Sequence, residues 1–106
     1  MDDRDRQVAE RLKERLRQEG IPLLELRVYG SRARGDATAE SDLDVFLLVE
    51  KLDPDVERVI SYLAWEVGFE AGVVITTVEF TPEQAYDSPL RFSPFLQTVE
   101  REGVRV

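Results

Sequence analysis

Two aspartates, Asp42 and Asp44, open an apolar run that continues to Val49, and this feature most constrains the fold. A stretch that is apolar at nearly every position is typical of a central strand buried on both faces. Side chains two positions apart on a strand point the same way, so the two carboxylates should stand about 7 Å apart at the backbone. The sequence therefore predicts a pair of acids on one strand face, beside a buried segment.

Such a pair repels by about 2 to 3 kcal/mol at an effective dielectric constant of about 20. A fold rarely keeps this repulsion without a positive charge between the two groups. Upstream, Gly30 and Ser31 form a turn where the backbone can approach a phosphate, because glycine permits dihedral angles that a side chain forbids. Ser31 adds a hydroxyl at the start of a helical turn, where anions are favoured. Paired oxygen ligands that face such a turn indicate Mg²⁺ carrying a nucleotide.

Composition narrows the chemistry further. The chain has no cysteine and no histidine, so carboxylates are the main acid, base and ligand groups. A net charge of -8 makes DNA or RNA a poor main partner, since phosphate neutralisation needs clustered basic residues. No apolar run approaches a membrane span, and the acidic start is unlike a signal peptide. With 106 residues, we expect a single cytoplasmic domain over 1–106.

Periodicity and capping signals predict an α+β fold, a small mixed sheet with helices packed on it in two layers. The expected helices are about Asp5 to Glu19, a turn at Ser31 to Gly35, Pro54 to Gly68, and short helices from Pro82 and Pro94. The expected strands are Leu23 to Tyr29, Leu43 to Val49 and Val73 to Val78, with Val104 to Val106 as a tail or an edge strand.

Three aromatic residues, Tyr62, Trp65 and Phe69, follow one another at helical spacing beside the core stripe of the second long helix. They can complete the edge of the core or form a docking surface, and the sequence leaves both interpretations open.

Two rival phosphate or metal sites are excluded. In a calcium-binding loop that starts at Glu40, the sixth position would be Val45 instead of glycine and the twelfth Lys51 instead of glutamate. The chain also lacks the Gly-Lys-Ser/Thr sequence of a P-loop.

The segment from Tyr29 to Val49 resembles the minimal nucleotidyltransferases (MNT) of the DNA polymerase beta-like superfamily. Their signature is an apolar residue, Gly-Ser, a spacer of about ten residues and Asp-x-Asp. The resemblance implies the nucleotidyltransferase fold and a site of two parts. Asp42 and Asp44 would be catalytic and hold Mg²⁺, and four residues would bind the nucleotide: Gly30, Ser31, Arg32 and Ser41.

The same resemblance implies transfer of a nucleoside monophosphate, AMP from ATP, to a hydroxyl of a partner protein. Small proteins of this kind resemble the antitoxins of two-component modules whose toxin is an all-helical HEPN protein. We therefore expect a HEPN-type partner and a nucleoside triphosphate, no membrane, and leave a homo-oligomer open.

Arg32 and Arg34 lie two positions apart on a short helix, so at most one of them should reach the triphosphate. Arg32 is nearer the start of the helix and is the better candidate.

Active members of the superfamily carry a third carboxylate on the next core strand. Between Gly72 and Val78 this chain has no acid. Glu70 and Glu79 flank this segment, and Glu70 could join Asp42 and Asp44 as a metal ligand if the strand starts early. Otherwise Glu70 is a solvated surface residue. The missing acid supports an alternative function, a catalytically weak nucleotide-binding antitoxin that acts by binding its partner.

Overall fold

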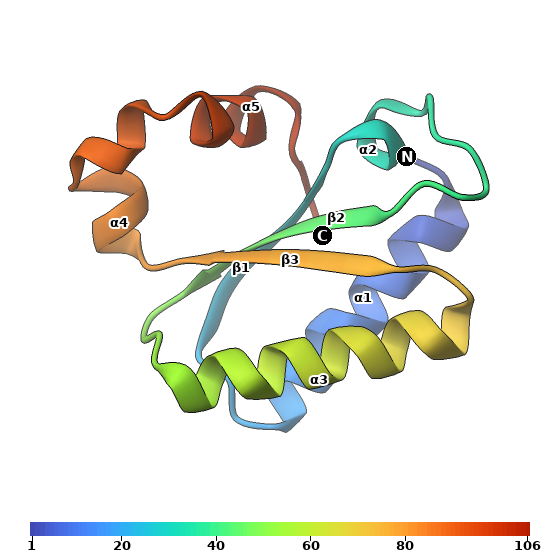
Figure 1. Cartoon of the computed structure of the whole chain (residues 1–106), viewed down its shortest axis with the longest axis horizontal. Helices are drawn as coiled ribbons and strands as arrows, with labels where there is room; N and C mark the ends of the chain where they lie inside the picture. Colours follow the sequence, from blue (N-terminus) through green and yellow to red (C-terminus); the bar gives the residue numbers. More distant parts are fainter.

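A mixed four-stranded sheet in the order β3-β2-β1-β4 forms the centre of the computed structural model, which describes residues 1–106 (Figure 1). β1 (Leu23–Tyr29) pairs antiparallel with β2 (Leu43–Val49), and β2 pairs parallel with β3 (Ile75–Phe80). β4 (Val104–Arg105) pairs antiparallel with β1, so the end of the chain is an edge strand and not a free tail. The predicted α+β class with a mixed sheet is confirmed.

Helices lie on both faces of this sheet, so the α+β fold has three layers and not the two that the sequence predicted (Figure 1). The long helices α1 (Asp3–Gln18) and α3 (Pro54–Ala71) cover one face and enclose the main apolar core. The other face carries α4 (Pro82–Tyr86), the 3-10 turn η1 (Pro89–Phe92) and α5 (Pro94–Glu102), over a smaller apolar cluster. The fold contains no helix with the length and hydropathy of a membrane span.

The alternation of β2 decides which face the acids occupy. Val45 and Leu47 point into the core beneath α1 and α3, whereas Phe46 and Leu48 belong to the cluster beneath α5. Asp44 is in phase with Phe46, so its side chain points toward the α5 face. The site therefore opens on the side of the sheet that the short helices cover.

The end of α3 differs from the prediction. Gly68 was expected to end this helix, but α3 continues to Ala71, and Gly72 closes it in the left-handed conformation with φ 74°. A Cβ on Gly68 would lie 2.5 Å from the carbonyl oxygen of Val73. Gly68 therefore allows a close approach of the chain instead of ending the helix.

This longer helix delays the following strand. The Val73 N–H donates to the carbonyl of Gly68 at 3.0 Å, as expected of a helix that ends in a left-handed residue. β3 consequently starts at Ile75, two residues later than predicted.

The three aromatic side chains on α3 are exposed, Tyr62 to 58%, Trp65 to 62% and Phe69 to 76%. The Trp65 ring lies 6.1 Å from the Tyr62 ring and 5.6 Å from the Phe69 ring, measured between centroids. The interpretation as a core edge is therefore wrong. We call these three residues the α3 aromatic stripe.

Candidate functional site

The two predicted carboxylates lie at the start of β2. Asp42 directly precedes the strand and is exposed, whereas Asp44 is the second residue of the strand and half-buried. Asp44 is the register partner of Tyr29 on β1 and of Thr76 on β3, so it sits between two neighbouring strands. The hydroxyl of Thr76 donates a hydrogen bond to Asp44 Oδ1 at 2.7 Å, which fixes one carboxylate oxygen.

The Gly30 turn lies directly against Asp44. Gly30 has φ 77° and ψ -158°, a region that is essentially restricted to glycine. A Cβ at this position would lie 2.4 Å from Asp44 Oδ2. The glycine therefore serves two needs, the dihedral angles of the turn and the close approach of the acid to the backbone.

Beside this turn lies an acid, Glu102, that no pattern in the sequence singled out. Glu102, the last residue of α5, accepts a hydrogen bond from the Gly30 N–H at 3.2 Å and one from the Arg34 guanidinium at 3.1 Å. The Glu102 carboxylate is thus the anion that the Gly30 N–H and Arg34 bind in this structure. Arg34 is half-exposed and also contacts Asp36 at 3.2 Å. Arg34 is consequently the arginine of α2 (Ser31–Arg34) that lies at the turn.

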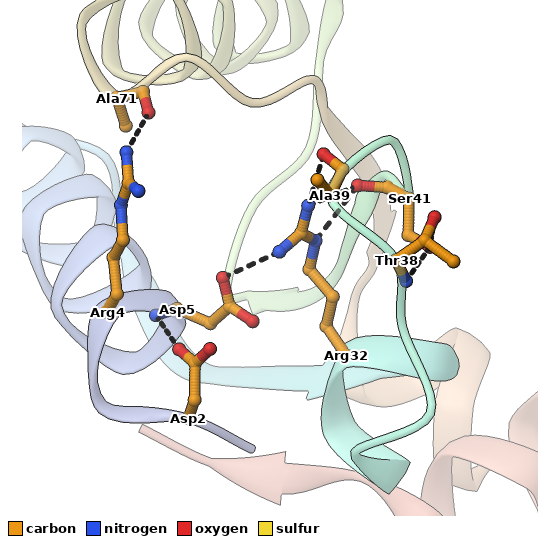
Figure 2. Close-up of polar contacts among 8 residues, drawn as sticks. All are labelled: Asp2, Arg4, Asp5, Arg32, Thr38, Ala39, Ser41 and Ala71. Atoms are coloured by element: carbon orange, nitrogen blue, oxygen red, sulfur yellow. Dashed lines mark hydrogen bonds and ion pairs between the residues drawn. The ribbon is translucent and has the colours of Figure 1, made fainter.

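Arg32 points the other way, toward α1 and the loop that follows α2 (Figure 2). Its guanidinium pairs with Asp5 at 3.0 Å and donates to the carbonyl of Ser41 through Nε at 2.9 Å. These partners direct Arg32 away from the position where a nucleotide was expected.

The two serines have different surroundings. The Ser41 hydroxyl accepts a hydrogen bond from the Thr38 N–H at 3.0 Å and so closes a small turn just before Asp42. Ser31 begins α2 next to the glycine, and its carbonyl accepts from the N–H groups of Gly35 and Asp36. Ser31 is thus at the turn, and Ser41 supports the loop that leads to Asp42.

Glu70 does not join the aspartates. It is exposed on α3, where it borders a shallow surface depression with Arg4 and Arg11 of α1. The strand that would have carried it toward the site starts only at Ile75. No group of three acidic side chains comes close enough to hold a metal ion. At the level of Asp44, β3 presents Thr76 instead, and only the register of the parallel pair identifies this position.

The pKa of Tyr29 reflects the burial and the negative charge around Asp44. Burial, and secondly the charge of Asp44, raise the pKa of its hydroxyl to about 12. Its ring packs edge-on against Phe95 of α5, with 5.4 Å between centroids. The wall behind Asp44 is therefore aromatic and partly dry, a setting in which charge interactions are stronger than in water.

The oxygen atoms at the start of β2 suit Mg²⁺ that is bound together with a nucleotide. Asp42 and Asp44 would offer hard oxygen ligands to such an ion, and the Thr76 hydroxyl already contacts Asp44. Mg²⁺ is usually held by one or two carboxylates together with substrate phosphates and waters. The site therefore matches a magnesium ion that arrives with a nucleotide better than one held by the protein alone.

This combination of a mixed sheet, a glycine turn and paired acids at the strand start defines the class of protein. Residues 6–99 match the family model of the nucleotidyltransferase domain, and the chain belongs to this family. None of the curated proteins matches the sequence.

Solved structures agree on the fold. A toxin–antitoxin structure with AMP-PNP superposes with a TM-score of 0.65 and 20% identity, over 92% of this chain and 70% of that chain. The tri-AMPylated HEPN toxin in complex with MNT antitoxin from Shewanella oneidensis gives a TM-score of 0.59 and 17% identity, over 95% and 70% of the two chains. The family model thus confirms the nucleotidyltransferase family, and the solved structures, one of them with an MNT antitoxin, confirm the fold that the resemblance implied.

Proposed function

We propose that this chain binds Mg²⁺ with a nucleoside triphosphate against the Gly30 turn and transfers the nucleoside monophosphate, AMP from ATP, to a hydroxyl of a partner protein. The observation that supports the proposal is the close approach of Asp44 to Gly30, because it joins a turn suited to phosphate with an acid suited to a metal ion. Asp42 and Asp44 would hold the ion. When bound, Mg²⁺ would neutralise phosphate charge and fix the in-line geometry.

The reaction is a substitution at the α-phosphorus. The acceptor oxygen forms a bond to that phosphorus, the bond to the oxygen that bridges the α- and β-phosphates breaks, pyrophosphate leaves, and the proton of the acceptor hydroxyl passes to solvent water. The Gly30 N–H and the Arg34 guanidinium are the groups of this chain suited to hold phosphate oxygens, because both donate to an anion already.

The partner we propose is a HEPN-type protein, for which this chain would be the antitoxin. Support comes from the similar solved structures, which are described as toxin–antitoxin complexes, one of them with a HEPN toxin. The α3 aromatic stripe is the candidate surface for this contact, because three large exposed rings on one helix are unusual for a protein without a partner there.

A labelling experiment tests the transfer. The chain is incubated with its HEPN-type partner, Mg²⁺ and α-labelled ATP, and we expect label on the partner that is lost with Asp44→Asn. Asp87 is an exposed acid at the end of α4, and Asp87→Asn is the matched control. This variant should label the partner as the unmodified chain does. If the partner stays unlabelled with both the unmodified chain and Asp87→Asn, the transfer is refuted.

A second candidate function is favoured by Thr76. Because the position beside Asp44 on β3 holds a hydroxyl and not a third acid, a nucleotide-binding antitoxin with weak or no turnover is the alternative. In that case inhibition of the partner should survive Asp42→Asn combined with Asp44→Asn, and no label should be transferred.

A further inference from the structure

Arg32 is the largest polar side chain near the site for which the proposed function gives no role. Its side chain is only 12% exposed, and that of its partner Asp5 on α1 is 9% exposed. Removing two charges from water costs several kcal/mol per ion before their attraction repays it. A buried ion pair is thus weak evidence for stability alone, and the position of Arg32 calls for a geometric explanation.

The guanidinium connects three segments of the chain (Figure 2). One terminal nitrogen donates to Asp5 at 3.0 Å, while Nε and the other terminal nitrogen donate to the Ser41 carbonyl at 2.9 and 2.7 Å. A longer contact of 3.4 Å reaches the carbonyl of Ala39. Nearly all of its N–H groups are therefore engaged, and Asp5 already balances its charge.

The loop between α2 and β2 accepts two of these hydrogen bonds at the Ser41 carbonyl. It forms a small turn of its own, in which the Ser41 N–H donates to the Thr38 carbonyl at 3.1 Å and the Thr38 N–H to the Ser41 hydroxyl at 3.0 Å. Both hydrogen bonds join Thr38 to Ser41, so neither connects the turn to a helix. Arg32 joins it to α1 and α2, and the residue after Ser41 is Asp42.

Asp42 needs such support because its neighbour Asp44 carries the same charge. Without a cation, repulsion favours conformations in which the exposed Asp42 swings away from the strand. Holding the carbonyl of Ser41 fixes the backbone one residue before Asp42 and so restricts this movement. A planar guanidinium suits the task, because it can donate to one oxygen from two nitrogens, which a lysine ammonium cannot do with the same geometry.

We infer that Arg32, anchored by Asp5, is a positioning residue that holds Ser41 and thereby presents Asp42 beside Asp44 for the metal–nucleotide complex. The inference deepens the proposed function and rests on it. It also reassigns Arg32, which moves from a phosphate ligand to a support of the metal ligand.

The test compares Arg32→Lys and Asp5→Asn with Arg15→Lys. Arg15 is the matched control, because it forms a comparably shielded ion pair with Glu66 between α1 and α3 but does not contact the loop. Three quantities are measured on each purified chain: the affinity for Mn²⁺ with AMP-PNP by calorimetry, amide hydrogen exchange across residues 36–43, and the thermal unfolding midpoint.

We expect Arg32→Lys and Asp5→Asn to weaken binding by about tenfold or more, as is typical when an outer support of a metal ligand is removed. Exchange in residues 36–43 should accelerate by a similar factor, because the loop loses its link to α1. Arg15→Lys should lower the unfolding midpoint and leave both the affinity and the loop exchange unchanged. Asp5→Asn keeps the test decisive if Arg32→Lys does not fold.

The outcomes separate this inference from the proposed function. If both variants bind as the unmodified chain does, or if Arg15→Lys weakens binding equally, the positioning role is refuted. If even the unmodified chain does not bind Mn²⁺ with AMP-PNP, the proposed function fails, and the loop exchange alone decides the inference: faster exchange in Arg32→Lys supports the link to Asp42, and unchanged exchange refutes it.

Discussion

Thr76 on β3 and Asp44 on β2 are direct partners in the parallel ladder, and the threonine hydroxyl donates to Asp44 Oδ1 at 2.7 Å. An acid at position 76 would face Asp44 across the two strands. Like charges in this relationship destabilise a sheet by up to about 1 kcal/mol. The position therefore reveals whether a cation belongs between the strands.

We predict that Thr76→Asp lowers the unfolding midpoint by about 4 to 8 °C in EDTA, the shift that 1 kcal/mol produces in a domain of this size. Mg²⁺ or Mn²⁺ should restore most of the loss, because a bound divalent ion stabilises the folded state by mass action. Thermal unfolding with and without metal measures both effects.

Thr76→Asn is the control for this variant, because asparagine has the size of aspartate but brings no charge to face Asp44. Its loss of stability should be insensitive to metal. Equal rescue of both variants, or no rescue of Thr76→Asp, would contradict a cation site at Asp44.

Gly30→Ala tests the contact between the turn and the acid. The substitution forces a Cβ into a glycine-only conformation and to within 2.4 Å of Asp44 Oδ2, so we expect a loss of about 3 kcal/mol in unfolding free energy. Nucleotide binding should be lost as well, because Asp44 must move. Gly35→Ala shares a positive φ of 86° but meets nothing within 4 Å, and should cost only about 1 kcal/mol, with binding retained. Urea unfolding and calorimetry check the pair.

Local signals predicted most of the elements correctly. Asp53 caps α3 with Pro54 at its first position, and Thr81 with Gln84 forms a capping box at the start of α4. Both motifs work within a few residues of the chain, so neighbouring residues suffice to identify them. Gly68 misled the prediction because its role is a tertiary contact with Val73, which helix-ending rules do not describe.

The residues of the site also differ in whether the sequence alone could identify them. The spacing of Gly30 and Asp44 was visible in the sequence, and the antiparallel pairing of β1 with β2 brings them together. The partners of Arg32 could not be found by spacing, because Asp5 lies on another helix and Ser41 on a loop without regular structure. Likewise, Thr76 is identified only once the register of β2 with β3 is known.

The titration of Tyr29 offers a probe of the charge at Asp44. The pKa of Tyr29 is about 12 in the fold, against 10.0 as its ordinary value, chiefly through burial and secondly through Asp44. Asp44→Asn should therefore lower this pKa only in part. Phenolate absorbance of the chain minus that of Tyr29→Phe isolates the titration.

The sign of the pH dependence follows from the same shift. Between pH 10 and pH 12 the unfolded chain loses the Tyr29 proton while the folded chain keeps it, so stability falls as the pH rises through this window. Below pH 10 the group contributes no pH dependence. Chemical unfolding at pH 9 and pH 11 should show a smaller loss for Tyr29→Phe than for the unmodified chain.

Trp65 is the only tryptophan of the chain and makes the α3 aromatic stripe directly observable. Because it is 62% exposed, its emission should be red-shifted and strongly quenched by acrylamide. If the proposed partner docks on the stripe, binding should shift the emission to the blue and protect it from the quencher. Phe69→Ser should weaken that binding by about tenfold or more, as expected for an exposed aromatic anchor of an interface.

Leu24→Ser, an exposed apolar residue on β1, is the matched control and should leave the affinity for the partner unchanged. If the complex forms without any change in Trp65 emission, the interface lies elsewhere on the chain. The proposal of a HEPN-type partner would still hold in that case.

The Glu102 carboxylate accepts from the two donors that we assign to the phosphates, so it competes with a bound nucleotide. It accepts from the Gly30 N–H at 3.2 Å and from Arg34 at 3.1 Å. A triphosphate that binds to these groups has to displace the carboxylate and overcome its repulsion. We therefore expect Glu102→Gln to bind AMP-PNP with Mg²⁺ about three- to tenfold more tightly, since charged hydrogen-bond acceptors compete more strongly than neutral ones.

Glu100→Gln is the control on the same helix. Its carboxylate is exposed and lies 3.8 Å from Arg27, away from the turn, so the affinity should not change. Calorimetric titration of the three chains under identical salt conditions decides the matter. Weaker binding by Glu102→Gln would mean that the acid builds the site instead of competing for it, because the Gly30 turn and Arg34 would then need the carboxylate to stay in place.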